Sequence, residues 1–353
     1  MIEGGVGGTT CARVGYMPSK LLIAAPEAAY EVCYTTPFGI HIEGEIRING
    51  REVMARVWSE RDRFVGRVLG RAASIPAQDR YTGYACFIDD TVLAIGDYAT
   101  VQAHSVVIAT GSGPYIPPAL LVFGDRLVVN DDVFNWEDLP HRIAVFGPGV
   151  IGLEVGQAFA RLGVQVRVFD VQEAVGLLTD PMVVEQVKFD LGEEFYLHPD
   201  ATIHEMKLDD NEAVIVFTEL DGSVVTGRFN YVLACTGRKS NVDSLNLENT
   251  TLQLNKLGIL VFDAKTLQCG TAPVFIAGDA NNILLLLHEA ADEGKMAGRN
   301  AAHYPDIEVL PRRAPISIVS ADPQIAMVGQ RYVDQEPRNI VTEAMDFTDQ
   351  GRS

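Results

Sequence analysis

The chain has 353 residues, 47% of them hydrophobic, which is enough for two or three domains with sizeable cores. Its formal net charge of −19 argues against nucleic acid and anionic membrane surfaces as partners. Apolar runs fall well short of the ~20 residues that span a bilayer, no signal peptide is visible, and the five cysteines are scattered without CxxC pairs. This composition predicts a cytoplasmic protein without a metal site.

The first residues read as half of a nucleotide-binding unit. Met1 to Glu3 is expected to be the tail of a strand, followed by a glycine-rich turn and a helix in GGVGGTTCARVGYMPSK. An acidic strand end followed by glycines is typical of the second half of a Rossmann unit, and the first half is expected to be missing. Residues 28–73 read mainly as helix with a turn at 36–39, because apolar residues recur near helical spacing.

Short β runs follow between residues 81 and 109. They read as a meander that ends in a buried strand, Ser105 to Ala109, followed directly by the turn ATGS. A glycine after a strand lets the backbone approach a cofactor closely. Prolines at positions 114, 117 and 118 then mark a connection to another part of the chain.

The most informative stretch is RIAVFGPGVIGLEVGQAFARLGVQVRVFD, from Arg142 to Asp170. It predicts a buried strand (143–146), a helix (about 150–162) and a second strand (164–169). Glycines 147, 149 and 152 occupy G-x-G-x-x-G spacing between the first strand and the helix. This complete strand–turn–helix–strand context is what the dinucleotide fingerprint requires.

Each glycine of the fingerprint has a mechanical reason. The first makes the tight turn, the second lets a pyrophosphate approach the backbone, and the third allows close packing of helix on strand. The helix N-terminus then offers unpaired N–H groups to the phosphates. Asp170, 21 residues beyond Gly149, can accept a hydrogen bond from the ribose 2′-OH, which favours NAD over NADP. The alternative is a tight turn that binds no ligand.

The remainder predicts further alternation of helix and strand. A helix is expected at residues 181–193, and β runs at 213–218, 224–229 and 231–237, the last leading into TGRKSN. A strand end at 275–277 is closed by Gly278 and Asp279, and the helix LLLLHEAADEG follows. PISIVSADPQIAMVG then predicts about two more strands from residue 311 onward.

These motifs together resemble the pyridine nucleotide–disulfide oxidoreductase family (class I), most of all its dihydrolipoamide dehydrogenases. The matching patterns are GGTC-x4-C-x-PSK, ATGRxPN, LLHEAADEG and TDPxIAxVG, each at the corresponding place in this chain. The resemblance implies an α/β fold with two nested Rossmann-like nucleotide-binding domains in three layers, plus the start of an α+β interface domain. It also implies FAD and NAD as cofactors.

The resemblance divides the chain into four segments. Residues 1–138 correspond to the first part of the FAD-binding domain, without its N-terminal βαβ, and residues 139–262 to the NAD-binding domain. Residues 263–310 return to the FAD-binding domain, and residues 311–353 begin a dimerisation domain that is cut short. A homodimer is therefore expected if that domain is restored.

The resemblance also implies the site residues. The catalytic positions are Cys11, Tyr16, Lys20 and Glu154. Those for FAD are Glu3, Gly8, Thr9, Lys20, Thr110, Gly111, Ser112, Gly278, Asp279 and Leu286. Those for NAD are Gly147, Gly149, Val150, Ile151, Gly152, Glu154, Asp170 and Gly237. Three of these carry plainer alternatives: Cys11 as a buried, inert thiol, Glu154 as an exposed residue of the first helical turn, and Asp279 as an N-cap.

Three departures from the family pattern set the functional expectation. Tyr16 stands where the family has its flavin-proximal cysteine, and a phenol cannot form a disulfide. The FAD glycine fingerprint and the C-terminal His-x4-Glu pair are both missing. We expect a flavin-dependent NAD(H) oxidoreductase that resembles dihydrolipoyl dehydrogenase, acts on a small dithiol or another electron acceptor, and has impaired disulfide chemistry. The alternatives are a diaphorase or transhydrogenase-like flavoprotein, and a non-catalytic NAD-binding remnant.

Overall fold

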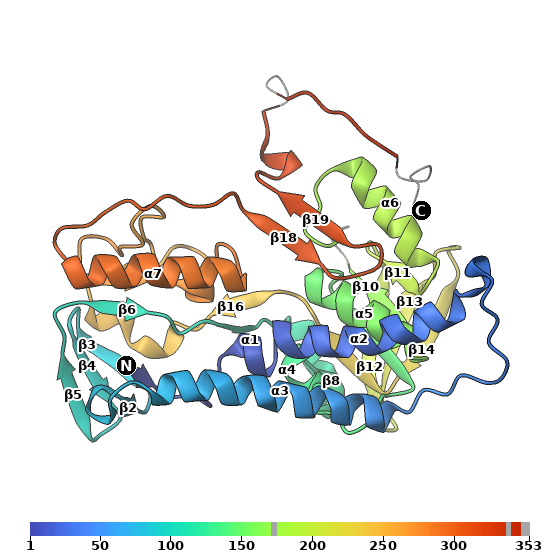
Figure 1. Ribbon diagram of the computed structural model, residues 1–353, viewed down its shortest axis with the longest axis horizontal. Coiled ribbons are helices and arrows are strands. Elements are labelled where there is room, and N and C mark those ends of the chain that lie inside the picture. The colour runs from blue at the N-terminus through green and yellow to red at the C-terminus, as the bar shows by residue number, and fades with distance from the viewer. Residues whose placement is uncertain (171–174, 337–339, 347–353) are drawn as a thin grey trace.

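The computed structural model describes residues 1–170, 175–336 and 340–346 (Figure 1). Its central feature is a five-stranded, all-parallel sheet in the order β11-β10-β9-β15-β8. The predicted buried strands therefore pair side by side, as in a doubly wound fold. Their bounds are β8 Leu127–Val128, β9 Arg142–Phe146, β10 Gln165–Phe169, β11 Tyr196–His198 and β15 Tyr231–Ala234.

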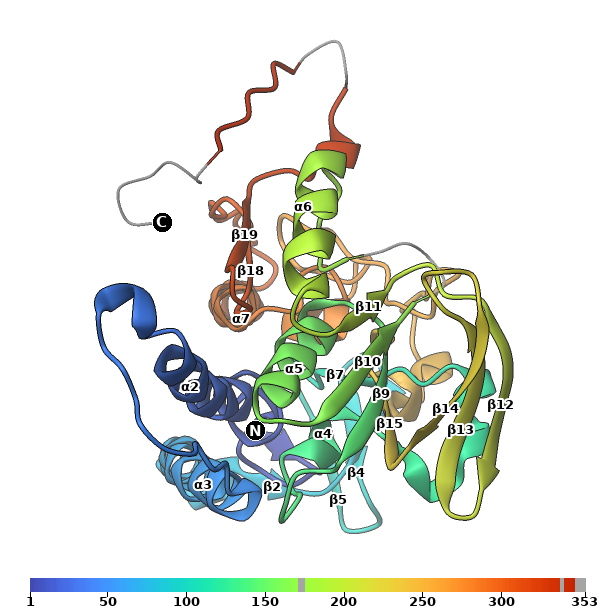
Figure 2. The same ribbon diagram turned by 90° about the vertical axis from the view of Figure 1, so that its right-hand side faces the viewer.

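Both faces of this sheet are covered, which makes three layers (Figure 2). Successive side chains of a strand point to opposite faces, so Val145 packs on the helical side while Ala144 and Phe146 pack on the other. The helical layer contains α5 Val150–Arg161 and α6 Pro181–Gly192, the second capped by Asp180 through the N–H of Met182. The other layer is an antiparallel sheet: β12 Ile203–Asp209, β13 Glu212–Thr218 and β14 Val224–Phe229.

The N-terminal segments form the second part of the molecule. Here β1 pairs in parallel with β2, β6 pairs in parallel with β17, and β3, β4 and β5 form the predicted meander. In the described residues the two parallel pairs are not hydrogen-bonded to one another. The strands are β1 Ile2–Glu3, β2 Tyr81–Thr82, β3 Ala85–Asp89, β4 Val92–Ile95, β5 Ala99–Gln102, β6 Val106–Ile108 and β17 Val274–Ile276.

Helices and two small β pairs complete the described fold. Helix α7 lies along β6 and β17 (Figure 1), and α2 lies between α3 and α5. A β7–β16 pair ties the two parts together, and β18 and β19 form an antiparallel hairpin. The bounds are α1 Thr10–Arg13, α2 Tyr16–Cys33, α3 Gly50–Ala73, α4 Asn130–Val133, α7 Leu287–His303, β7 Ser112–Pro114, β16 Arg238–Ser240, β18 Ile316–Val319 and β19 Ile325–Val328.

One sequence prediction is wrong in detail. Residues 40–49 are neither helix nor strand, although we expected helix to resume directly after the turn at 36–39. The apolar residues of this stretch alternate with polar ones at period two, which does not suit a helix. Helix α3 begins only at Gly50, after Asn49, whose side chain accepts a hydrogen bond from the N–H of Glu52.

Candidate active site

The glycine turn between β9 and α5 has the geometry that its three glycines predict. Gly147 has φ +98°, and a Cβ there would lie 2.4 Å from the carbonyl oxygen of Cys235. A Cβ on Gly152 would lie 2.0 Å from the carbonyl oxygen of Gly147, so only glycine lets the helix approach this closely. A Cβ on Gly149 would meet no atom within 4 Å. The turn is closed on its protein side and open where a diphosphate has to approach.

The other residues predicted for NAD lie at the same edge of the sheet. Val150 and Ile151 begin α5. Asp170 directly follows β10, where its N–H donates to the carbonyl of His198 (3.1 Å) and its carbonyl accepts from Ala201 (2.7 Å). Gly237 follows β15 with φ +107° and open space around its Cβ position. The carboxyl ends of parallel strands are where open α/β sheets bind nucleotides.

A partly buried ion pair joins α2 and α5 at the predicted catalytic centre. The Nζ of Lys20, on α2, lies 2.6 Å from Oε1 of Glu154, on α5. The Glu154 side chain is 5% exposed, and the same oxygen accepts the N–H of Ser320 at 2.8 Å. The alternative of an exposed Glu154 is therefore wrong: α2 and the loop after β18 cover it. A carboxylate held by an ammonium and a backbone N–H is a charge fixed in one position.

Cys11 lies on α1, and Tyr16 begins α2 close to Lys20. Tyr16 is 54% exposed, and Lys20 Nζ lies 5.0 Å from the centre of its ring. Cys11 is a free, half-buried thiol. Burial, followed by the negative charge of Asp279, raises the pKa of Cys11 above its ordinary value, and hydrogen bonds from the backbone of Met17 and Tyr16 offset this in part. The raised pKa favours the neutral thiol of Cys11 over the thiolate.

The ATGS turn lies against the Gly278–Asp279 turn. Oγ of Ser112 donates to Oδ2 of Asp279 at 3.1 Å, and Nε of Arg238 donates to Oγ of Ser112 at 2.8 Å. Asn241 holds the turn as well, through its N–H to Gly111 and its amide to the carbonyl of Thr110. The Gly278–Asn281 turn has Ala277 as its N-cap, so the alternative of Asp279 as a helix cap is wrong.

The remaining residues predicted for FAD lie at the end of β1, at the start of α1 and at the start of α7. Glu3 ends β1 and accepts the N–H of Gly5. Gly8 has φ +111°, and Thr9 (φ +63°) caps α1 by accepting the N–H of Ala12. Leu286 is the N-cap of α7, and its side chain makes no capping hydrogen bond. The first N–H groups of α7 are therefore left without a capping side chain.

Sequence reasoning missed three residues of this site. Arg238 and Asn241, both within TGRKSN, donate hydrogen bonds to the carbonyls of the ATGS turn. The two polar side chains close after Gly237 could have indicated this role in the sequence. Ser320 donates its backbone N–H to Glu154, so the identity of its side chain could not predict this role.

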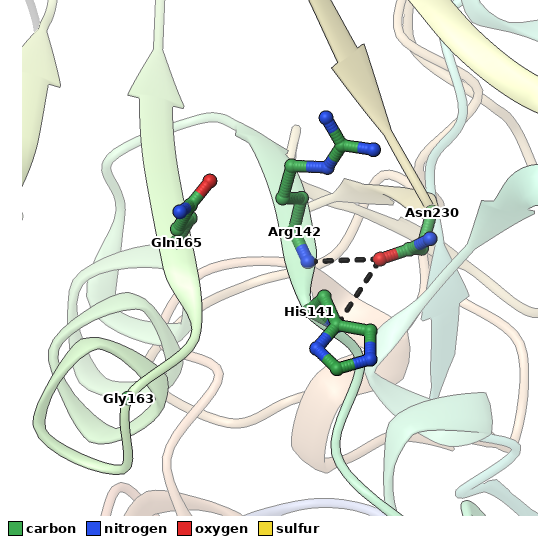
Figure 3. Close-up of a pocket in the computed structure, with 5 residues that line it drawn as sticks. All are labelled: His141, Arg142, Gly163, Gln165 and Asn230. Carbon is green, nitrogen blue, oxygen red and sulfur yellow. Dashed lines mark hydrogen bonds between the residues drawn. The ribbon is translucent and has the colours of Figure 1, made fainter.

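A hollow lies elsewhere, at the other edge of the parallel sheet. It has a volume of about 390 Å³ and is lined by His141, Arg142, Gly163, Gln165 and Asn230 (Figure 3). These residues stand at the amino ends of β9 and β10, opposite the edge that carries the glycine turn. In the described residues we find no group of three or more His, Cys, Asp or Glu side chains arranged to hold a metal. None of the described helices is both long and apolar enough to cross a membrane.

Comparison with known proteins identifies the family. Residues 1–294 match the model of the pyridine nucleotide-disulphide oxidoreductases. The chain belongs to this family. Its members are oxidoreductases that use FAD and NAD(H), as the sequence resemblance implied.

Relatives and solved structures agree with this membership. The chain is 28% identical to dihydrolipoyl dehydrogenase of Chlamydia trachomatis, covering 98% of this chain and 74% of that one. It is 27% identical to the same enzyme of Geobacillus stearothermophilus (100% and 75%) and 26% identical to mercuric reductase of Staphylococcus aureus (93% and 59%). The flavoprotein disulfide reductase RclA of Escherichia coli has the same fold, with a TM-score of 0.78 at 18% identity, covering 94% of this chain and 72% of RclA.

The residues of the candidate site fit one part of each cofactor. The open face of Gly149 and the first N–H groups of α5 suit a diphosphate. Gly111 has φ +71° and no atom within 4 Å of its Cβ position, and this open turn next to Asp279 suits the flavin side of FAD.

Proposed function

We propose that this chain is a flavin-dependent NAD(H) oxidoreductase of the dihydrolipoyl dehydrogenase type in which the dithiol reaction is impaired. The observation that carries the proposal is the composition of the centre. The Lys20–Glu154 ion pair, a glycine turn at the start of the helix that carries Glu154 and a free thiol at Cys11 support the proposal, while Tyr16, close to Lys20, stands where a second sulfur is needed. When bound, FAD supplies the two-electron chemistry between NAD(H) and a second substrate.

The proposed role of the NAD residues is binding and orientation. The N–H groups of Gly149, Val150 and Ile151 bind the diphosphate, and Asp170 at the end of β10 selects the ribose with a free 2′-OH. Gly147 and Gly152 keep the turn in place, and Gly237 leaves room for the nucleotide. The proposed site thus uses the carboxyl edge of the parallel sheet.

The proposed role of the catalytic residues is electrostatic. The N–H of Ser320 holds the Glu154 carboxylate, and Glu154 in turn fixes the Lys20 ammonium at one position. Asp279, held by Ser112, and the backbone at Gly8, Thr9, Thr110, Gly111, Gly278 and Leu286 line the space that FAD takes in the family. Glu3 is proposed to hold its ribose.

The limit on the dithiol reaction follows from the chemistry of exchange. Thiol–disulfide exchange needs an attacking thiolate, a disulfide sulfur and a leaving thiolate. Tyr16 supplies a phenol in place of one sulfur, and the pKa of Cys11 is raised. We therefore propose that electrons from NADH pass to a non-thiol acceptor such as a quinone or a dye. This diaphorase-type activity is the second candidate, and Tyr16 is the observation that favours it.

Absorbance and NADH binding test the proposal. A purified protein with visible flavin bands that oxidises NADH with a dye, and dihydrolipoamide poorly, supports it. A colourless protein that binds NADH indicates a non-catalytic NAD-binding protein instead. In a flavin-loaded preparation, Tyr16→Cys should raise dihydrolipoamide oxidation while leaving dye reduction unchanged, and no gain would show that Tyr16 is not the limiting residue.

Three further expectations stay proposals. They are the division into segments 1–138, 139–262, 263–310 and 311–353, a cytoplasmic location, and a homodimer formed through residues beyond 311. Positions 337–339 and 347–353 of the last segment lie outside the described residues.

A further inference from the structure

The chain after α7 turns back and runs along that helix toward β18 (Figure 1). The Glu308 N–H donates to the side-chain oxygen of Asn300 at 3.0 Å, and the Glu308 carbonyl accepts from the Asn300 amide nitrogen at 3.0 Å. Further along, Nη2 of Arg312 lies 2.7 Å from Oε2 of Glu289 and 2.8 Å from Oε1 of Glu293. This connection is therefore fixed to α7 at two places.

The second of these attachments compensates two carboxylates that the fold removes from water. Glu289 and Glu293 lie one helical turn apart on α7 and are 6% and 2% exposed. Among the described residues, Arg312 is the only Lys or Arg side chain within ion-pair distance of either one. A buried carboxylate is stable only where it is paired and hydrogen-bonded. Arg312 supplies that compensation to both residues from outside the helix.

The other oxygen of Glu293 holds the turn that carries Asp279. Oε2 of Glu293 accepts the N–H of Gly278 at 2.8 Å and the side-chain amide of Asn281 at 2.6 Å. Gly278 has φ +69°, and Asn281 is 2% exposed. Asp279 lies between these two donors, and its carboxylate accepts the hydroxyl of Ser112. Glu293 thus fixes the backbone on both sides of Asp279.

These contacts use both carboxylate oxygens of Glu293. Oε1 accepts from Arg312, and Oε2 accepts the two donors of the turn. A glutamine at this position has one acceptor oxygen, and its NH₂ group would face a donor on the other side. It could satisfy the turn or the arginine, but not both. The carboxylate is therefore the group that suits this position.

We propose that Glu293 is a positioning residue for FAD, and that Arg312 stabilises it in this role. Glu293 holds the Gly278–Asn281 turn in the conformation in which Asp279 faces the cofactor. Through Arg312, the affinity for FAD depends on the connection between α7 and β18. This inference rests on the proposed function, in which Asp279 contacts FAD.

Hydrogen exchange of the flavin-free protein, followed by mass spectrometry, tests whether Glu293 holds the turn. In Glu293→Gln the amides of residues 278–283 should exchange about tenfold faster, because the turn then competes for the one remaining acceptor. Arg313→Met is the matched control: its side chain is 73% exposed and pairs with Asp292 beside the same site, so exchange should not change. Unchanged exchange in Glu293→Gln overturns the proposal.

Titration with FAD, followed by flavin fluorescence, tests whether the held turn serves the cofactor. The dissociation constant should rise about tenfold in Glu293→Gln and in Arg312→Met, and Arg312→Lys should recover most of the loss because it keeps the charge. Asn300→Ala removes the other attachment of the connection. It should lower the melting temperature but leave the FAD dissociation constant within about twofold, which separates positioning from a general loss of stability. An equal loss of affinity in Asn300→Ala would overturn the proposal.

The double variant Glu293→Gln/Arg312→Met tests whether the two residues act through one carboxylate. Without the arginine, the glutamine oxygen is left to the turn, so the double variant should bind FAD no more weakly than Glu293→Gln alone. A loss equal to the product of the two single losses overturns the proposal. A wild-type chain that binds no FAD contradicts the proposed function itself. A wild-type chain that binds FAD, with both single variants binding it equally well, overturns only this inference.

Discussion

The oxygen Oε1 of Glu154 receives two donors from distant parts of the chain, the Lys20 ammonium and the Ser320 N–H. Lys20 is 25% exposed, so water screens it in part, while Glu154 is almost fully enclosed. Removing one member of such a pair leaves the other charge poorly compensated, and replacing both by apolar residues does not. Removing one member of the pair should therefore lower the stability of the protein more than replacing both members by apolar residues.

Glu154→Leu should lower the free energy of unfolding by about 1–3 kcal/mol, because Lys20 loses its partner and the Ser320 N–H its acceptor. The double variant Lys20→Met/Glu154→Leu should recover part of that loss in urea titrations. Glu185→Leu is the control, since its carboxylate is 74% exposed and its pair with Lys188 contributes little. A double variant less stable than Glu154→Leu would contradict this account.

Cys11 should react slowly at neutral pH. Its folded-state pKa is raised, mainly by burial, so the reactive thiolate forms only above the usual thiol range near ~8.5. Because the folded state favours the neutral thiol, its contribution to stability is present at low pH and is lost as pH rises through the raised pKa. Site-resolved mass spectrometry of iodoacetamide labelling should show this dependence in a Cys33→Ser background, which removes an exposed thiol. A midpoint below that of free cysteine would show that Cys11 is an activated thiol.

At the scale of elements, two glycines of the same turn have different roles: Gly152 is needed for packing, and Gly149 leaves space for a ligand. Gly152→Ala should destabilise the protein strongly and abolish NADH binding, because its Cβ would meet the Gly147 carbonyl at 2.0 Å. Gly149→Val should leave the melting temperature within a few degrees of wild type and weaken NADH binding about tenfold or more, because its side chain fills only the open face. Thermal unfolding and NADH fluorescence titration measure the two effects. If Gly149→Val unfolds the protein, the open face is not a ligand face.

The same elements show what the sequence could predict. Strands β9, β10 and β15 were predictable because they are apolar runs bounded by glycines or by a turn, and α5 because its helical pattern starts at the fingerprint. The burial of Glu154 was not, because it depends on Lys20 and Ser320, which are 134 and 166 residues away. The length of α3 was misjudged because residues 40–49 were assigned the helical pattern of their neighbours.

The hairpin β18–β19 is held by one face of α5. The Gln157 side chain pairs with Asp322 in both directions, accepting its N–H and donating to its carbonyl, and Arg161 donates to its carboxylate. Arg161 also binds Glu194 through two hydrogen bonds and stacks over the ring of Tyr30 at 3.6 Å. Through this contact the loop after β18 reaches Glu154, so the hairpin stabilises the ion pair as well as the helix.

At the scale of the whole molecule, the cores do not follow the four predicted segments. The largest cluster of buried side chains joins Leu22 and Met54 of α2 and α3 to Val145 and Leu153 of the predicted NAD-binding segment, and to Ile325 of the hairpin. A separate cluster, which includes Phe87 and Ile276, fills the meander side. The unit that unfolds together should therefore include α2 even though the sequence assigns α2 to the FAD-binding part.

Leu22→Ala tests this coupling. Leu22 is fully buried on α2, and its truncation should cost about 2–4 kcal/mol. Trp136, stacked on Phe159 and Tyr231, reports the state of that same core by fluorescence once Trp58→Phe removes the other tryptophan. The Trp136 midpoint in urea should fall clearly in Leu22→Ala and much less in Ile276→Ala, which opens a cavity of similar chemistry in the separate cluster. Equal shifts in both variants would mean that the molecule unfolds as a single unit. An unchanged midpoint in Leu22→Ala would mean that α2 detaches before the sheet does.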